Sequence, residues 1–124
     1  MIPYQYVVLR CVPRVDRGEA INVGVILYAQ AAEALLCATH LDEARLAALS
    51  PGTDAGSVRA SLAAITAVCA GRAGDGLPHL DGLGRRFGWL AAPRSTVVQP
   101  GPVHGGVTAD PTVEIERLLD RLVR

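Results

Sequence analysis

The fold is decided by two segments, Tyr4-Gln-Tyr-Val-Val-Leu-Arg-Cys-Val12 and Glu19-Ala-Ile-Asn-Val-Gly-Val-Ile-Leu-Tyr28, which a short turn joins. Both segments are rich in β-branched and aromatic residues, which favour strands. Apolar side chains occupy nearly every position, as is typical of strands buried on both faces, and Pro13 ends the first segment. The sequence therefore predicts a hairpin of two central antiparallel strands.

Three polar residues interrupt these apolar strands, and their placement depends on the register. The register that we expect pairs Arg10 with Asn22, Tyr6 with Ile26 and Tyr4 with Tyr28. In this register Arg10 and Asn22 share one sheet face with Gly24, whose missing side chain leaves room for a long neighbour. A buried charge is costly unless it is paired, so Arg10, Glu19 and Asn22 mark either a structural polar cluster or the floor of a site.

The rest of the chain is assigned from periodicity and capping residues. Gly71 and Gly74 are expected to end the second helix, and Asp110 followed by Pro111 is a clean start for the last helix. The glycine- and proline-rich segment 100–106 is predicted to be a loop. The predicted elements are a strand over 33–39, helices over 41–49 and 53–70, a helical turn over 80–87, a strand over 95–99 and a helix from 110.

This order, β-β-β-α-α-β-α, predicts an α+β fold with a small antiparallel sheet and helices packed mainly on one face. The length of 124 residues is enough for a single domain, 1–124, with its own core. We see no internal repeat and no linker that would divide the chain.

Composition excludes several classes of protein. Twelve basic and twelve acidic side chains give a formal net charge of zero, without the basic excess of nucleic-acid-binding proteins. There is neither a signal-peptide pattern nor an apolar run that could cross a membrane. The cysteines Cys11, Cys37 and Cys69 are odd in number and widely spaced, which favours reduced thiols. We therefore expect a cytoplasmic protein that binds neither membranes nor nucleic acid.

The polar residues of the hairpin allow two interpretations. As a binding site, Arg10 and Asn22 on one sheet face would hold a carboxylate or phosphate, with Glu19 as the acid or base. As structure, Arg10 would pair with Glu19 or a C-terminal carboxylate, and Asn22 would bind a backbone group. The sequence alone leaves both interpretations open.

A second polar cluster precedes the last helix. Arg94, Ser95, Thr96 and, downstream, His104 provide a guanidinium, two hydroxyls and an imidazole beside a glycine-rich loop. Such donors suit an oxyanion site, whereas the structural alternative is an exposed strand with ordinary polar contacts. A ligand site built from both clusters requires Arg10, Glu19, Asn22, Arg94 and His104 to converge in one pocket.

Other chemistry has little support. Cys37 and His40 are three residues apart, but the remaining Cys and His residues have no metal-ligand spacing. Neither a glycine-rich nucleotide loop nor a nucleophile elbow around Ser95 is present. We expect no metal and no cofactor, and the sequence assigns no catalytic residue.

Two long motifs resemble the bacterial family called domain of unknown function 3037. The first is Arg10, Pro13, Arg17, Gly18, Glu19, Asn22, Gly24, Val25 and Leu27, and the second is 86–99, which looks like the actinobacterial branch. His104-Gly105-Gly106 and Asp110-Pro111 fit the C-terminal pattern. The turn 29–32 departs from the pattern, because it lacks the Asp, Pro or Gly of a tight hairpin.

The resemblance implies no established activity, but members are often encoded beside a HipA-like kinase. Our first hypothesis is therefore a small cytoplasmic accessory or interaction protein, a homo-oligomer and partner of such a kinase, with Phe87 and Trp89 at a contact surface. The alternative is a small enzyme or binding protein for an anionic, phosphate- or carboxylate-bearing metabolite.

Overall fold

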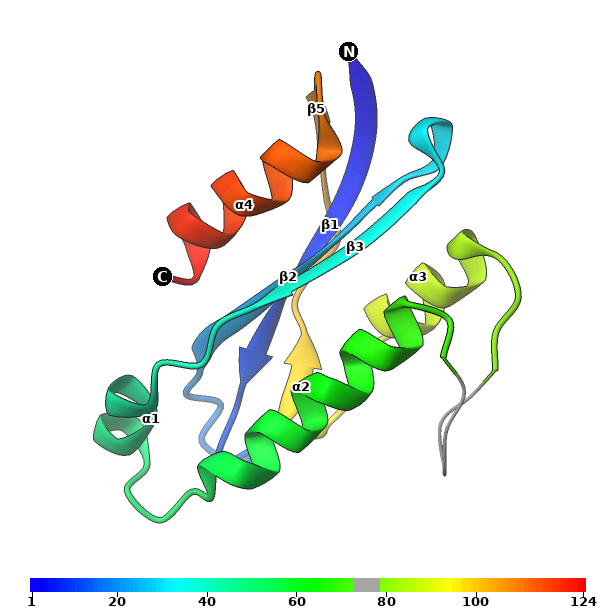
Figure 1. Cartoon of the computed structure of the whole chain (residues 1–124). Coiled ribbons are helices and arrows are strands. Elements are labelled where there is room, and N and C mark those ends of the chain that lie inside the picture. Colours follow the sequence, from blue (N-terminus) through cyan, green and yellow to red (C-terminus); the bar gives the residue numbers. More distant parts are fainter. Residues whose placement is uncertain (73–78) are drawn as a thin grey trace.

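Within residues 1–72 and 79–124, which the computed structural model describes, the chain forms a five-stranded antiparallel sheet and four α-helices (Figure 1). The α+β prediction is therefore confirmed. The elements are β1 (Ile2–Cys11), β2 (Ile21–Ala29), a 3₁₀ turn (Gln30–Ala32), β3 (Ala34–Thr39), α1 (Glu43–Leu49), α2 (Ala55–Cys69), α3 (Leu83–Ala91), β4 (Val98–Pro100), β5 (His104–Thr108) and α4 (Pro111–Leu122).

The predicted hairpin is the centre of the sheet. The strand order is β3-β2-β1-β4, and β5 also pairs with β1. β4 pairs with Leu9–Cys11 and β5 pairs with Ile2–Tyr6, so these two short strands follow one another along the same side of β1. Residues 104–106 of β5 were predicted to be loop because glycine has low strand propensity, and pairing with β1 overrides it.

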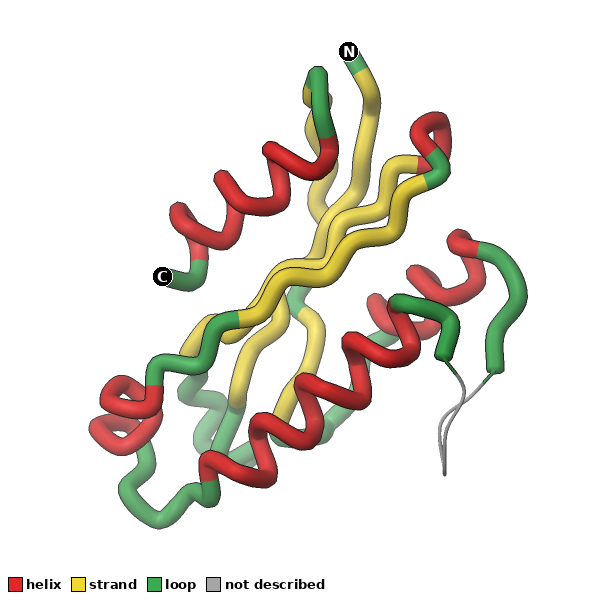
Figure 2. The backbone as a smooth tube through the Cα atoms, viewed as in Figure 1, coloured by secondary structure: helices red, strands yellow, loops and turns green. Residues whose placement is uncertain are grey.

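Helices cover both faces of the sheet. α2 and α3 lie on one face and α4 lies on the other, as the two sides of the ribbon in Figure 2 show. The expectation of helices on one face thus holds for α2 and α3, and α4 adds a second layer. It does so because both alternating sets of β1 and β2 side chains are apolar, giving one core against α2 and α3 and another against α4.

A bulge changes the predicted register partway along the hairpin. Arg10 pairs with Asn22 as expected, but Tyr6 pairs with Leu27, one residue away from the expected Ile26. The shift lies between Leu9 and Arg10, and an extra residue on one strand turns the following side chains to the other face. In consequence the side chain that lies over Gly24 is Leu9, whose Cδ1 would be 3.1 Å from an added Cβ.

Aspartates begin three of the helices. The side chains of Asp42, Asp54 and Asp110 accept a backbone N–H in the first turn of α1, α2 and α4. α2 ends at Gly71, whose φ of +77° is favourable only for glycine, with Arg72 N–H bonding Ala67 C=O at 2.9 Å. Gly74, the other expected terminator, lies outside the described residues.

The unusual connection after β2 is a short 3₁₀ turn. Gln30–Ala32 form this turn, and Glu33 follows it with φ of +49°. A glycine-free connection is therefore possible because a single residue takes the left-handed conformation. None of the helices in 1–72 and 79–124 combines the length and the apolar character needed to cross a membrane.

Candidate functional site

The seven candidate residues do not share one cavity. Asn22 and Arg10 lie on the α4 face of the sheet, and His104 pairs with Tyr6, which belongs to the same face. Arg94 and Thr96 line a small cavity of about 180 Å³ together with residues of α2, on the opposite face. Glu19 and Ser95 are exposed in loops.

Glu19 lies in the turn between β1 and β2 and is paired locally. Its carboxylate accepts a hydrogen bond from Arg17, and the neighbouring Arg14 pairs with Asp16 at 2.8 Å. The hydrogen bond from Arg17 lowers the pKa of Glu19 below its usual value. The expected pair between Arg10 and Glu19 is therefore replaced by an exposed pair, and Glu19 is ionised at neutral pH.

Asn22 has the backbone role that the structural interpretation expected. Its Nδ2 donates to the carbonyl of Leu122 at 2.9 Å, and Arg45 Nη1 donates to the carbonyl of Val123 at 2.8 Å. The last carbonyls of a helix have no partner within the helix. Asn22 thus attaches the C-terminal end of α4 to the sheet.

Arg94 closes the C-terminal end of α3. Its Nη2 donates to the carbonyls of Trp89 at 2.6 Å and Leu90 at 3.3 Å, and its guanidinium lies 4.6 Å from the centre of the Trp89 ring. Thr96 is likewise occupied, since its hydroxyl donates to the carbonyl of Val98 at 2.7 Å. The donors proposed for an oxyanion therefore bind the protein's own backbone.

Replacing Arg94 with alanine should consequently weaken α3. Loss of the capping bonds and of the contact with Trp89 is expected to cost about 1–2 kcal/mol of unfolding free energy. Arg94→Lys should restore little of it, because an ammonium cannot reproduce the planar fork. Chemical unfolding followed by Trp89 fluorescence measures the effect, and an unchanged midpoint for Arg94→Ala would exclude the capping role.

Arg10 remains the most ligand-like of the candidates. Its Nε is buried and is the one buried side-chain N or O atom without a hydrogen-bond partner among the residues that the structure describes. Gln99 and Asn22 lie opposite it on the neighbouring strands, and Gly101 lies beside it. An arginine with an unused buried donor can accept an anion.

The sequence analysis missed a buried network between the N-terminal strand and α4. Tyr4 donates its hydroxyl proton to Glu114, which is 7% exposed, and Arg117 binds both Glu114 oxygens at 2.7 and 2.9 Å. Burial and the neighbouring carboxylate raise the pKa of Tyr4 to about 12, and hydrogen bonding to Arg117 lowers that of Glu114 to about 2. Glu114 was detectable, because it lies one position before Ile115 on the apolar stripe of the last helix.

Two cysteines that are distant in sequence meet between β3 and α2. Cys37 Sγ is 3.8 Å from the hydroxyl of Thr66, and Cys69 Sγ is 3.7 Å from the carbonyl of Leu35. A hydrogen bond between the thiols lowers the pKa of Cys37 and raises that of Cys69. Both are free thiols, and no group of three or more His, Cys, Asp or Glu side chains suited to a metal ion is found in the described part of the chain.

The aromatic residues expected at a contact surface serve mainly inside the chain. Phe87 is 6% exposed and stacks on Tyr28 with 5.3 Å between ring centres, so it belongs to the core. Trp89 is 37% exposed and is partly covered by Arg94.

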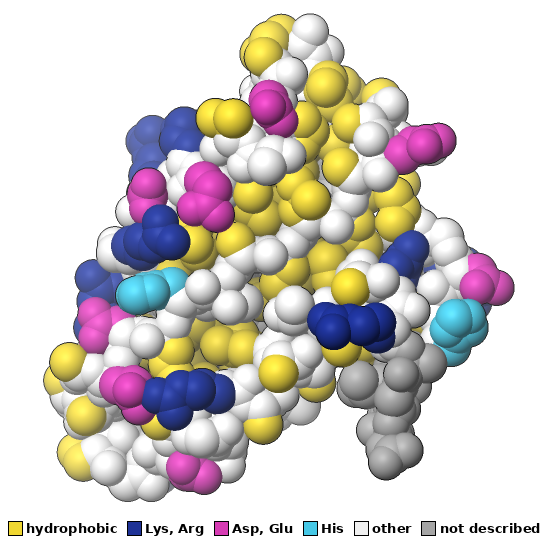
Figure 3. Space-filling model, in the orientation of Figure 1, with side chains coloured by type: hydrophobic (Ala, Val, Ile, Leu, Met, Phe, Trp, Pro, Cys, Tyr) yellow, Lys and Arg dark blue, Asp and Glu magenta, His cyan; other side chains and the backbone are white. Residues whose placement is uncertain are grey.

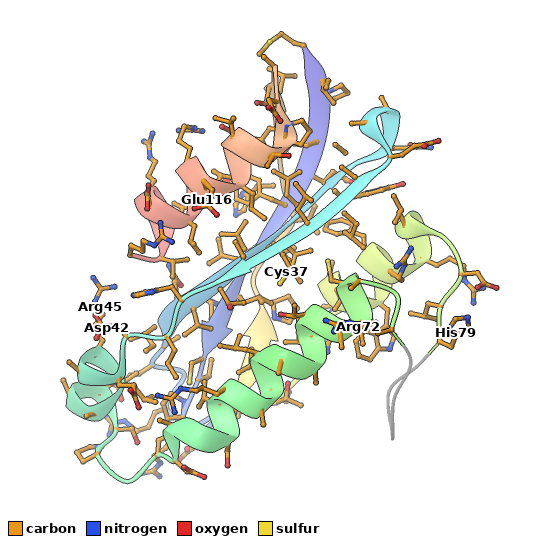
Figure 4. The ribbon with its side chains drawn as sticks, viewed as in Figure 1. Cys37, Asp42, Arg45, Arg72, His79 and Glu116 are labelled. Carbon is orange, nitrogen blue, oxygen red and sulfur yellow. The ribbon has the colours of Figure 1, made fainter. Side chains whose placement is uncertain are left out.

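A different surface has the character of a contact site: the β3 edge, which we define as β3 together with the exposed side of α2. Figure 3 shows hydrophobic side chains along the middle of this view, where β3 crosses it, with charged groups on either side. Cys37 lies at the middle of β3 (Figure 4). Beside the strand, a groove of about 640 Å³ is lined by Thr39, His40, Leu41, Arg59, Leu62, Ala63, Thr66, Ala67 and Arg72.

Comparison with known proteins gives one result. No curated protein and no solved structure matches the chain. The profile of the family described as "Protein of unknown function (DUF3037)" matches residues 6–123. The resemblance noted in the sequence is thereby confirmed over nearly the whole chain, and the chain belongs to this family.

Proposed function

We propose that the chain is a small cytoplasmic accessory protein of bacteria that acts through protein–protein contact. The observation that carries this proposal is the β3 edge. Every residue of β3 from Ala34 to Ala38 is only half-buried, although the strand has no charged side chain. An exposed, uncharged edge strand offers its backbone to another chain, and natural proteins usually protect such edges.

The flanking helix has the same character. Arg59 is the sole charged residue of the 15-residue helix α2, and its charge is compensated by Glu43 at 2.5 Å. The side chains on the exposed side of α2 are otherwise small, including Ala60 and Ala63. Depletion of charge is a mark of interface centres, whereas an exposed helix normally carries several charged residues.

The partner to test first is a HipA-like kinase, which the family resemblance suggests. The purified kinase encoded beside this gene should bind the chain in a calorimetric titration at up to roughly 50 µM, which detects binding free energies of about −6 kcal/mol. We expect Thr39→Lys, a change at an exposed position of β3, to abolish the heat of binding. A charge there opposes the addition of a strand.

The matched control is Val107→Lys on β5, at the opposite margin of the sheet, where the side chain is 59% exposed. It should leave the binding unchanged. Absence of binding by the wild-type chain would reject the kinase as the partner. Equal binding by both variants would reject the β3 edge as the contact surface.

A second candidate function, binding of an anionic metabolite, is favoured by Arg10 alone. Inorganic phosphate in a thermal unfolding assay should raise the midpoint of the wild-type chain, because a ligand that binds the folded state stabilises it. Arg10→Gln should remove that rise, whereas Arg121→Gln, at an exposed position of α4, should retain it. A rise of equal size in all three proteins would mean general ionic stabilisation without a site at Arg10.

A further inference from the structure

We propose that the β3 edge pairs with the β3 edge of a second copy of this chain, in antiparallel orientation about a two-fold axis at Cys37. The two sheets would then form one continuous sheet, with the two α2 helices side by side on one face. This inference rests on the proposed function, because it uses the same surface, and it adds the occupant and the register.

The backbone of β3 is set for such pairing. His40 N–H donates to the carbonyl of Val23 at 2.9 Å, so the alternating pattern directs the backbone groups of Leu35, Cys37 and Thr39 away from β2. In the described residues no strand pairs with that side of β3. Three alternate residues with outward N–H and C=O groups can bond an antiparallel strand without any rearrangement.

The side chains of β3 are complementary to themselves in this register. With Cys37 opposite Cys37 of the second copy, Leu36 lies opposite Ala38 and Leu35 opposite Thr39, so each leucine meets a smaller residue. A two-fold axis also places a residue beside its own copy, where like charges would repel. The segment 34–39 has no charge, and this cost is therefore absent.

The other margin of the sheet shows what a protected edge looks like in the same chain. There, pairing along β1 is interrupted between β4 and β5, and prolines occur at Pro100 and Pro102. Breaks and prolines are the usual means of preventing edge-to-edge association. β3 has neither of these, nor a lysine or a bulge. The contrast indicates that β3 is covered in the working protein.

A six-residue strand is too small for the roughly 1,200 Å² that stable interfaces bury, so α2 must contribute. The groove beside β3 is lined on the helix side by Ala63 and Ala67. Small side chains allow two helices to approach closely, and the second copy's α2 can occupy this groove. A monomer would leave these apolar groups in water.

Sedimentation equilibrium of the purified wild-type chain tests the pairing. We expect a mass twice that of the chain at micromolar concentration. Cys37→Lys places two ammonium groups opposite one another and should weaken the dimer about 100-fold or more. Thr39→Lys, which changes an exposed side chain, tests the same edge if Cys37→Lys fails to fold. Val107→Lys should remain dimeric.

Amide hydrogen exchange of the wild-type chain tests the register directly. The outward N–H groups of Leu35, Cys37 and Thr39 should be protected at high protein concentration and exchange faster on dilution. Those of Leu36 and Ala38, bonded to β2, should stay protected at both concentrations. A monomeric wild-type chain, or exchange at 35, 37 and 39 that is independent of concentration, would overturn the inference.

The same proteins separate this inference from the proposed function. A monomer that binds the kinase through the β3 edge overturns self-pairing only. A dimer that ignores the kinase rejects that partner and supports self-pairing. A kinase that binds and also dissociates the dimer supports both, with the kinase competing for one edge.

Discussion

Replacing Glu114 with glutamine is expected to lower the unfolding free energy by about 2 kcal/mol and the thermal midpoint by roughly 6–10 °C at neutral pH. The carboxylate accepts from Tyr4 and holds both arms of Arg117, and it lies almost fully buried at the start of α4. A neutral amide weakens these charge-assisted bonds and forces one of its N–H groups toward another donor. Tyr4→Phe should have a smaller effect of the same sign.

The pH dependence follows from the direction of each shift. Glu114 has its pKa lowered from 4.5 to about 2, so its contribution is complete above pH 4.5 and disappears as the pH falls toward 2. Tyr4 has its pKa raised from 10.0 to about 12, so its contribution is complete below pH 10 and is lost as the pH rises toward 12. Unfolding measured across both windows should show wild type and Glu114→Gln converging at low pH.

Glu116→Gln is the matched control for this substitution. Glu116 lies on the same helix but is exposed, and its nearest cation is Arg124 at 3.6 Å. Such exposed pairs contribute little, about 0–1 kcal/mol. Equal midpoints for the Glu114 and Glu116 variants would show that the buried network does not hold α4 to the sheet.

Replacing Gly106 with alanine should cost about 1–3 kcal/mol, the usual range for overpacking. Gly106 lies opposite Tyr4 in the β1–β5 pair, and an added Cβ would lie 2.6 Å from the Tyr4 hydroxyl and 2.7 Å from its ring. The tyrosine ring would have to move, and its bond to Glu114 would be lost with it. Denaturant unfolding measures the loss.

Gly105→Ala, the adjacent substitution, is the control, because its Cβ would meet only the carbonyl of Tyr4 at 3.6 Å. It should be neutral within about 0.5 kcal/mol. In a Tyr4→Leu background the cost of Gly106→Ala should shrink, since the two changes share one contact. A penalty that is the same in both backgrounds would exclude the clash as its cause.

Local signals in the sequence were sufficient for most of the secondary structure. The hairpin, the helix over 53–70 and the start at Asp110 follow from side-chain periodicity and from capping, which depend on near neighbours alone. β5 escaped because its two glycines favour no strand, and its pairing partner is about a hundred residues away. The register was correct at Arg10 and shifted at Tyr6, because the bulge is fixed by packing on both faces.

The candidate site shows the same division. The sequence identified Arg10, Asn22 and Arg94 as polar residues in apolar surroundings, and each does have a special environment. It could not place them on opposite faces, nor reveal that carbonyls from the ends of two helices are their partners. Hydrogen-bond partners of this kind depend on which helix end the chain brings to a given strand.

By itself, then, the sequence determined the fold class, the family and the uncharged character of 34–39, because composition and alternation are properties of the chain order. The tertiary structure alone decided that this uncharged strand lies at the margin of the sheet, where its backbone remains open. The same residues in a central position would be a silent part of the core. Position within the sheet is set by long-range strand pairing, and it converts an ordinary apolar strand into a contact surface.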